Sequence, residues 1–136
     1  MRVFVAGASG AIGTRLVPQL VDRGHEVIGT SRTPEKAEHI RALGAEPVAL
    51  DLLDRAAVRR AVLEAELDAI VHQATALADL TFSRNFDRVF AKTNRLRTEG
   101  TDALLAAASL GAPLPQLARG FRGRLQADRS GGGARD

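Results

Sequence analysis

The stretch VFVAGASGAIG, residues 3–13, places three glycines, spaced three apart, directly after a run of apolar β-forming residues. In this pattern Gly7 permits a tight turn out of a strand, and Gly10 lets the backbone approach a phosphate with no Cβ in the way. Gly13 lets the following helix pack closely against the strand. The free N–H groups at the start of that helix can then bind a dinucleotide diphosphate. The stretch therefore predicts a strand, a phosphate-binding turn and a helix.

The rest of the chain repeats this alternation of strands and helices. Strands are expected at residues 2–6, 26–30, 47–50 and 68–73, and helices at about 11–23, 33–43, 54–66 and 87–109. Ile12, Leu16 and Leu20 form the apolar stripe expected for the first helix. Thr33 and Asp54 are the expected N-caps of the second and third helices. The pattern predicts an α/β fold with a doubly wound parallel sheet of about four strands in the order 3-2-1-4.

The alternation stops after Gly111, so residues 1–111 are the expected dinucleotide-binding unit. Residues 112–136 show no strand or helix periodicity and contain a glycine triplet. We expect them to be a disordered tail, with ordering against the sheet as the alternative. Codons for residues 113–118, read one nucleotide later, can spell Arg-Phe-Leu-Ser-Ser, which leads to the hypothesis that the tail is frameshifted sequence.

Composition excludes several classes of site and partner. The chain has no cysteine, and its histidines (His25, His39 and His72) lack the spacing of metal ligands, so no metal is expected. No apolar run is long enough to span a membrane, and a strand that begins at residue 2 leaves no room for a signal peptide. We therefore expect a cytoplasmic protein without a membrane partner. The arginine-rich tail lacks interleaved aromatic residues, so nucleic acid is not an expected partner either.

Several further motifs make the sequence resemble the extended short-chain dehydrogenase/reductase superfamily, of the NAD-dependent epimerase/dehydratase type. In chain order they are the GxxGxxG loop, GHEV at 24–27, Asp51-Leu52, HQAT at 72–75, Asn94, Gly100-Thr101 and LLAA at 104–107. The resemblance covers about residues 2–111. It implies a Rossmann-like fold that binds NAD or NADP, and a small-molecule substrate that the sequence does not identify.

The residues after the second strand bear on the choice of cofactor. In a doubly wound fold this strand end meets the adenosine ribose, where a carboxylate selects NAD and an arginine pairs with a 2′-phosphate. Here Ser31-Arg32 follows the strand, and no acid occurs before Glu35. NADP(H) is therefore expected in preference to NAD(H), with an exposed loop charge as the alternative role of Arg32.

The resemblance extends the cofactor site to other strand ends. It implies that Asp51 accepts a bond from the adenine amino group, with helix capping as its alternative role, and that Ala74 and Thr75 line the nicotinamide side. The predicted cofactor-binding residues are Gly7, Ala8, Ser9, Gly10, Ala11, Ile12, Gly13, Ser31, Arg32, Asp51, Leu52, Ala74, Thr75 and Asn94.

No catalytic residue is predicted. The resemblance implies a catalytic tyrosine with a lysine four residues later, and a serine or threonine on a fifth strand. The sequence has no tyrosine, and its lysines, Lys36 and Lys92, both precede the place where that pair belongs. Two functions stay open: an NADP-binding member of this oxidoreductase/epimerase family whose catalytic half is missing, and a non-catalytic NADP-binding module for regulation or redox sensing.

A missing fifth strand has a physical consequence for the fourth. Its outer edge would present unpaired N–H and C=O groups, so we expect self-association through that edge. The long helix would also lose part of its cover. Leu96, Leu104 and Leu105 are therefore expected to be partly exposed.

Overall fold

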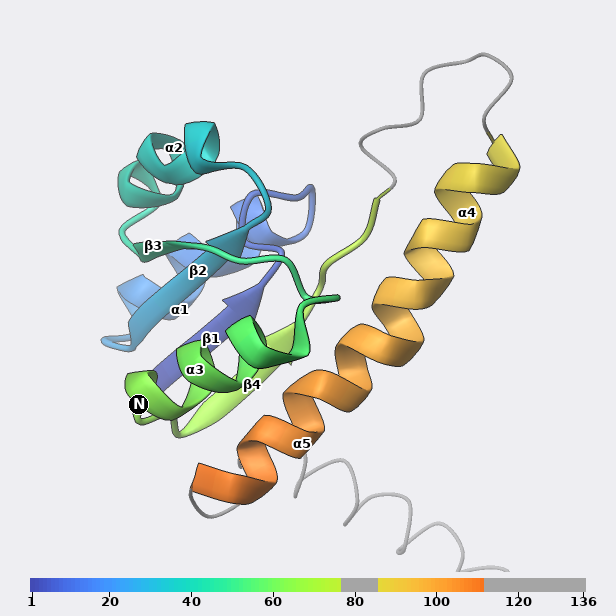
Figure 1. Ribbon diagram of the computed structural model, residues 1–136. Helices are drawn as coiled ribbons and strands as arrows, with labels where there is room; N and C mark the ends of the chain where they lie inside the picture. Colours follow the sequence, from blue (N-terminus) through green and yellow to red (C-terminus); the bar gives the residue numbers. More distant parts are fainter. Residues whose placement is uncertain (77–85, 112–136) are drawn as a thin grey trace, which may run out of the picture.

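The computed structural model describes residues 1–76 and 86–111. They form a four-stranded parallel sheet in the order β3-β2-β1-β4, which confirms the predicted fold class and strand order (Figure 1). Its strands are β1 (Arg2–Ala6), β2 (Glu26–Ser31), β3 (Glu46–Ala49) and β4 (Ala69–His72). The predicted tail, residues 112–136, lies outside the described residues.

Helices cover both faces of the sheet (Figure 1). They are α1 (Gly13–Asp22), α2 (Ala37–Ala42), α3 (Arg55–Ala65), α4 (Phe86–Arg95) and α5 (Thr101–Gly111), with a 3-10 turn η1 (Pro34–Lys36) before α2 and a π turn η3 (Leu96–Gly100) between α4 and α5. The helices α1 and α2 pack on one face, whereas α3 and α5 pack on the other. This two-sided cover is what a parallel sheet requires.

Strand β1 lies at the centre of both cores. Its side chains alternate, so that Phe4 packs with α3 and α5 while Val3 and Val5 pack with α1 and α2. All three side chains are buried. At its carboxyl end β1 pairs with β2 on one side and β4 on the other, which brings Thr30 and His72 to the same edge of the sheet as Ala6.

Two of the predicted apolar faces are wrong in detail. Helix α1 buries Gly13 and Val17, and Leu16 and Leu20 of the predicted stripe pack half-buried against the same core, whereas Ile12, the start of that stripe, is 60% exposed. The close packing of Gly13 on the preceding turn centres the buried face on Gly13 and Val17. In the long helix, Leu96 and Leu104 are buried, and only Leu105 is exposed as predicted, because α5 packs tightly on α3.

The predicted helix caps also have different outcomes. Asp54 caps α3 as expected, since its carboxylate accepts the N–H of Ala57 at 3.1 Å. Thr33 stands at the start of η1, but its side chain accepts no helix N–H. Its Oγ1 instead lies 3.4 Å from the Oγ of Ser31.

The helix expected at 87–109 is interrupted by the π turn η3, at Leu96–Gly100. A π turn holds one more residue per turn than an α-helix, and such turns gather at functional sites. An exposed ion pair joins the flanks of this turn, with Arg95 Nη2 and Glu99 Oε2 3.0 Å apart. The hydrogen bond from Arg95 lowers the pKa of the Glu99 carboxyl, and the bond to Glu99 raises the pKa of the Arg95 guanidinium.

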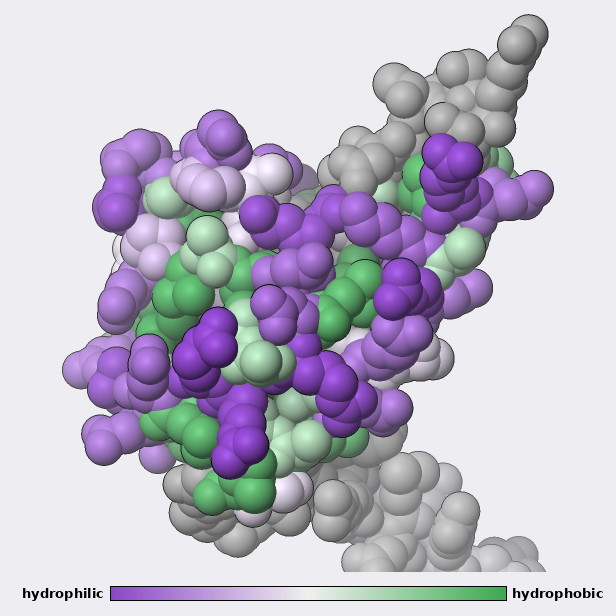
Figure 2. Space-filling model, viewed as in Figure 1, coloured by the Kyte–Doolittle hydropathy of each residue, from purple (hydrophilic) through white to green (hydrophobic). Residues whose placement is uncertain are grey.

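The surface is mixed, and within the described residues each outer strand of the sheet, β3 and β4, pairs on one side only. Figure 2 shows polar side chains over most of α2 and α4, with apolar ones gathered between them. Within the described residues β4 pairs with β1 alone, so the predicted open edge is present, while self-association through it stays a prediction. Among the same residues, no helix is long and apolar enough to cross a membrane, and no cluster of side chains suits a metal ion.

Candidate functional site

The glycine turn is built by close backbone contacts at the carboxyl end of β1. Gly7 has a φ of 86°, and a Cβ there would lie 2.7 Å from the N and Cα of Ala74. A Cβ on Gly13 would lie 2.3 Å from the carbonyl oxygen of Gly7. Both separations are shorter than real Cβ contacts, so these two positions require glycine. The turn is tied to β2, where Thr30 accepts the N–H of Ala8 at 3.0 Å.

Gly10 differs from Gly7 and Gly13 because a Cβ at this position would face open space. The nearest atom to a Cβ built there is the carbonyl oxygen of Gly7, at 3.4 Å. Within the described residues, the backbone N–H groups of Ala11 and Ile12 donate to no protein acceptor. These amides stand at the amino end of α1, where the helix dipole favours an anion. The geometry fits a diphosphate that lies over Gly10 and is bound by these amides.

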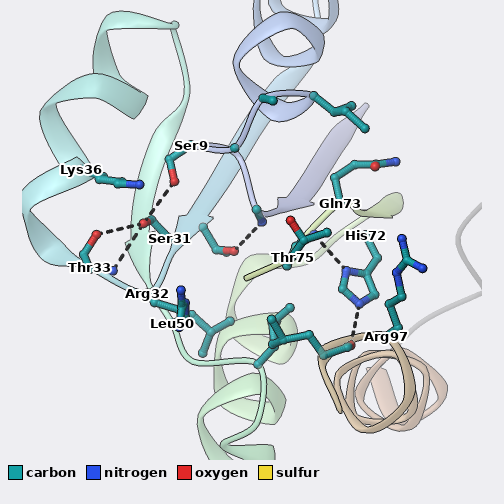
Figure 3. A pocket seen from close by; sticks show the side chains of 18 of the residues that line it. Ser9, Ser31, Arg32, Thr33, Lys36, Leu50, His72, Gln73, Thr75 and Arg97 are labelled. Carbon is teal, nitrogen blue, oxygen red and sulfur yellow. Dashed lines mark hydrogen bonds between the residues drawn. The ribbon is translucent and has the colours of Figure 1, made fainter. Parts of the chain in front are cut away.

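A cavity of about 860 Å³ runs from this turn along the carboxyl edge of the sheet (Figure 3). This is the edge where open α/β folds bind ligands. We call its side formed by Gly7 and residues 9–12, with Gly13 packed beneath them, the glycine wall, and its side formed by Leu96, Arg97 and Thr101 the helical wall. Between them lie the ends of β2, β3 and β4, which contribute residues 30–33, Leu50, Leu52 and residues 72–75.

The cavity lining is positively charged. Arg32 and Lys36 lie at the β2 end, and Arg97 lies on the helical wall (Figure 3). No aspartate or glutamate is among the described lining residues. Such a lining favours a ligand with several negative charges.

A cluster of hydroxyl groups stands between the glycine wall and the basic β2 end. Ser9 donates from its Oγ to the Oγ of Ser31 at 3.2 Å, and the backbone N–H of Thr33 donates to that same oxygen at 3.3 Å. Ser31 is buried and therefore holds a defined position. These bonds fix the backbone on both sides of Arg32.

The helical wall is joined to the end of β4 by side-chain hydrogen bonds. The Nε2 of His72 lies 3.0 Å from the carbonyl oxygen of Leu96, and the Nδ1 of His72 accepts the N–H of Ala74 at 3.3 Å. Farther along the exit, Thr93 accepts the N–H of Ala76 at 3.2 Å. The position of the β4 exit is therefore set by α4 and the π turn.

Most of the predicted cofactor residues gather around this cavity. Those that line it are Gly7, Ser9, Gly10, Ala11, Ile12, Ser31, Arg32, Leu52, Ala74 and Thr75. Ala8 and Gly13 are buried beneath the turn. Asp51 and Asn94 are exposed and are not among the lining residues. The Oδ1 of Asp51 accepts the N–H of Leu53 at 2.9 Å, just before α3, and the carbonyl of Asn94 accepts the hydroxyl of Thr98.

Several lining residues were not predicted as cofactor ligands. Lys36 follows Arg32 by four residues, and a basic pair after the second strand is a signal that could have found it. Thr30 is the second-last residue of β2, and its Oγ1 accepts the N–H of Gly7 at 3.3 Å. Arg97 has no local signal, because the π turn brings it to the cavity.

Comparison with known proteins agrees with this geometry. Residues 3–116 match the NAD dependent epimerase/dehydratase family. A 3-diazoavenalumate denitrifying reductase from a Streptomyces species is 45% identical over 108 residues, which are 79% of this chain and 34% of that protein.

Two solved structures share the fold. A protein assigned as an epimerase from Burkholderia cenocepacia J2315 superimposes with a TM-score of 0.66 at 33% identity, over 84% of this chain and 34% of that one. The UDP-glucose 4-epimerase of Thermus thermophilus, in complex with NAD, gives a TM-score of 0.64 at 28% identity, over 79% of this chain and 33% of that one. The chain thus spans about a third of the length of these relatives.

Proposed function

The chain belongs to the NAD dependent epimerase/dehydratase family, and we propose that it is the NADP(H)-binding amino-terminal part of an oxidoreductase or epimerase of that family. The observation that carries this proposal is the glycine wall. Gly7 and Gly13 leave no room for a side chain, while Gly10 and the amides of Ala11 and Ile12 are open to an anion. A dinucleotide diphosphate matches that arrangement in size and charge.

The preference for NADP(H) rests on the β2 end of the cavity, because the family binds NAD or NADP. Arg32 and Lys36 line that end, and no carboxylate stands among the described lining residues to accept the ribose hydroxyls of NAD. A guanidinium binds a phosphate through two parallel bonds, and an ammonium adds a second positive charge. The bonds of Ser31 hold the backbone beside Arg32 in place.

A titration with NADPH and NADH tests this assignment. We expect the wild-type chain to bind NADPH more tightly, and Arg32→Ala to weaken NADPH binding about 10- to 100-fold while NADH binding stays unchanged. Lys36→Ala should act in the same direction with a smaller loss. The matched control is Arg59→Ala, which removes an exposed arginine of α3 outside the cavity lining. Equal, weak binding of both cofactors to wild type would contradict the preference.

The second candidate is a non-catalytic NADP-binding module for regulation or redox sensing. The sequence bears on this candidate only through its residues: it holds no tyrosine, the residue that the family's reductases pair with a lysine for proton transfer. A chain that binds NADPH but oxidises it with no carbonyl compound would support this module. Turnover of NADPH with a small carbonyl substrate would favour the enzyme instead.

A further inference from the structure

His72, the last residue of β4, uses both ring nitrogens at the edge of the cavity (Figure 3). Its Nε2 lies 3.0 Å from the carbonyl oxygen of Leu96, and its Nδ1 lies 3.3 Å from the backbone nitrogen of Ala74. A carbonyl can only accept and a backbone N–H can only donate. Both bonds therefore form together only in the neutral imidazole that carries its proton on Nε2.

The two bonds hold both sides of the cavity. Ala74 is the residue against which Gly7 packs, since a Cβ on Gly7 would lie 2.7 Å from the Cα of Ala74. Leu96 is buried and opens the π turn, and the next residue, Arg97, lines the helical wall. His72 thus sets the separation between the exit of β4 and the helical wall.

The surroundings of the imidazole contain no negative charge among the described lining residues. The charged side chain that shares its part of the cavity is Arg97, on the helical wall (Figure 3). On β1, the residue paired with His72 is Ala6. Gly100 of the π turn packs between His72 and Leu52. None of these three neighbours has a side chain that titrates. A protonated imidazole would therefore lose the bond from Ala74 and gain no anionic partner.

We propose that His72 is a positioning residue for dinucleotide binding. In its neutral form it holds the Ala74–Thr75 segment against the π turn, and protonation of Nδ1 releases that segment. The inference rests on the proposed function, because the segment lines the cavity assigned to the dinucleotide. Acidification should consequently weaken cofactor binding through this one side chain.

Two amide variants separate the two bonds. In His72→Asn the side-chain oxygen stands near the place of Nδ1 and keeps the acceptor for Ala74, whereas in His72→Gln the side-chain nitrogen stands near Nε2 and keeps the donor to Leu96. Neither amide titrates between about pH 5.5 and pH 8. His72→Phe removes both bonds while it fills the space of the ring.

The experiment is a calorimetric titration with NADP⁺ at about pH 8 and about pH 5.5. At the higher pH we expect each amide variant to bind about 3- to 10-fold more weakly than wild type, and His72→Phe to bind more weakly still. Wild type should lose affinity on acidification by a larger factor than either amide variant. The 2′-phosphate of the ligand titrates in every sample, so the difference between proteins reports the imidazole.

His25→Gln serves as the matched control, because His25 lies outside the cavity lining, with its Nδ1 3.3 Å from the amino terminus of Met1. It should keep the pH profile of wild type. Nitrogen-15 NMR of the ligand-free wild type should show His72 protonated at Nε2 near pH 8.

The outcomes separate the two proposals. Unchanged affinity in both amide variants at both pH values, with normal binding by wild type, would overturn the role of His72 and leave the proposed function standing. A wild-type chain that binds neither NADP⁺ nor NAD⁺, with His72 in the expected tautomer, would overturn the proposed function instead. Thermal unfolding of each variant shows whether a loss of affinity comes from loss of the fold. If His72→Phe does not fold, the two amide variants still decide the test.

Discussion

The two sides of the cavity are built by opposite means. The glycine wall depends on missing atoms: Gly7 and Gly13 let backbone segments approach within distances that a Cβ would prevent. The helical wall depends on atoms that are present, because side-chain hydrogen bonds hold it against the exit of β4. The ring of His72, at the end of β4, bonds the carbonyl of Leu96, and the hydroxyl of Thr93, on α4, accepts the N–H of Ala76. An added methyl group should therefore damage the first wall, and a removed polar atom or methyl group should damage the second.

The largest effect is expected at the glycine wall. Gly13→Ala adds a Cβ 2.3 Å from the backbone oxygen of Gly7, which can move only if the turn moves. We expect a loss of at least about 3 kcal/mol in the free energy of unfolding, measured with urea. Gly10→Ala is the control, since its Cβ meets nothing closer than 3.4 Å, and it should change stability by less than about 1 kcal/mol. Equal stability of the two variants would break the comparison.

A core truncation on the helical wall should come next. Leu96 is 1% exposed, so Leu96→Ala leaves a cavity between the π turn and the sheet and should cost about 3 kcal/mol. Leu105 lies on α5 but is 45% exposed, and Leu105→Ala should cost less than about 1 kcal/mol. Chemical unfolding of both variants measures the difference. A small loss in Leu96→Ala would mean that the helical wall is loosely packed.

The loss of one hydroxyl group tests a single hydrogen bond between the helical side of the cavity and the exit of β4. Thr93→Val keeps the shape of the side chain but leaves the buried N–H of Ala76 without its acceptor, at an expected cost of about 1–2 kcal/mol. Amide hydrogen exchange at Ala76 should become faster in this variant. Thr93→Ser keeps the oxygen and should keep most of the protection. Exchange that is equally slow in all three proteins would show that the bond holds nothing in place.

The smallest effect concerns the exposed ion pair beside the π turn. The hydrogen bond from Arg95 lowers the pKa of Glu99 in the folded protein below the ordinary value of 4.5. The ion pair therefore stabilises the folded protein fully when the pH is above that ordinary value. This stabilisation is lost as the pH falls through the pKa of Glu99 in the folded protein. Glu99→Gln should lower the melting temperature slightly at about pH 7 and not at about pH 3, because both side chains are solvated. The same shift at both pH values would exclude this ion pair as its cause.

The contrast between the walls also explains what the sequence could predict. A wall made of close backbone contacts demands glycine, and the spacing of Gly7, Gly10 and Gly13 after a strand is visible in the sequence. The predicted stripe of α1 began at Ile12 because periodicity alone does not show which face a glycine presses against the turn. Val17, one turn after Gly13, is the buried residue.

The helical wall left much weaker signals. A regular helix through 87–109 was the prediction, and nothing in the sequence between Leu96 and Gly100 marks a π turn. An extra residue in one turn rotates all later side chains, so a face extrapolated from α4 no longer applies. The family resemblance selected Asn94, which is exposed and outside the lining, whereas Arg97 of the π turn lines the cavity. His72 was expected within the strand at 68–73 and was given no binding role, because its two partners are backbone groups that carry no sequence signature.

The central place of β1 has a consequence for synthesis. Its first residue, Arg2, is bonded through its N–H to Asp68, which lies 66 positions later in the chain. At a ribosomal rate of roughly 5–20 residues per second, β1 emerges about 3–13 seconds before the strand that covers its second side. During that interval an apolar ribbon on the nascent chain is open to pairing with neighbouring nascent chains, so crowded polysomes are where misassembly of this protein would begin.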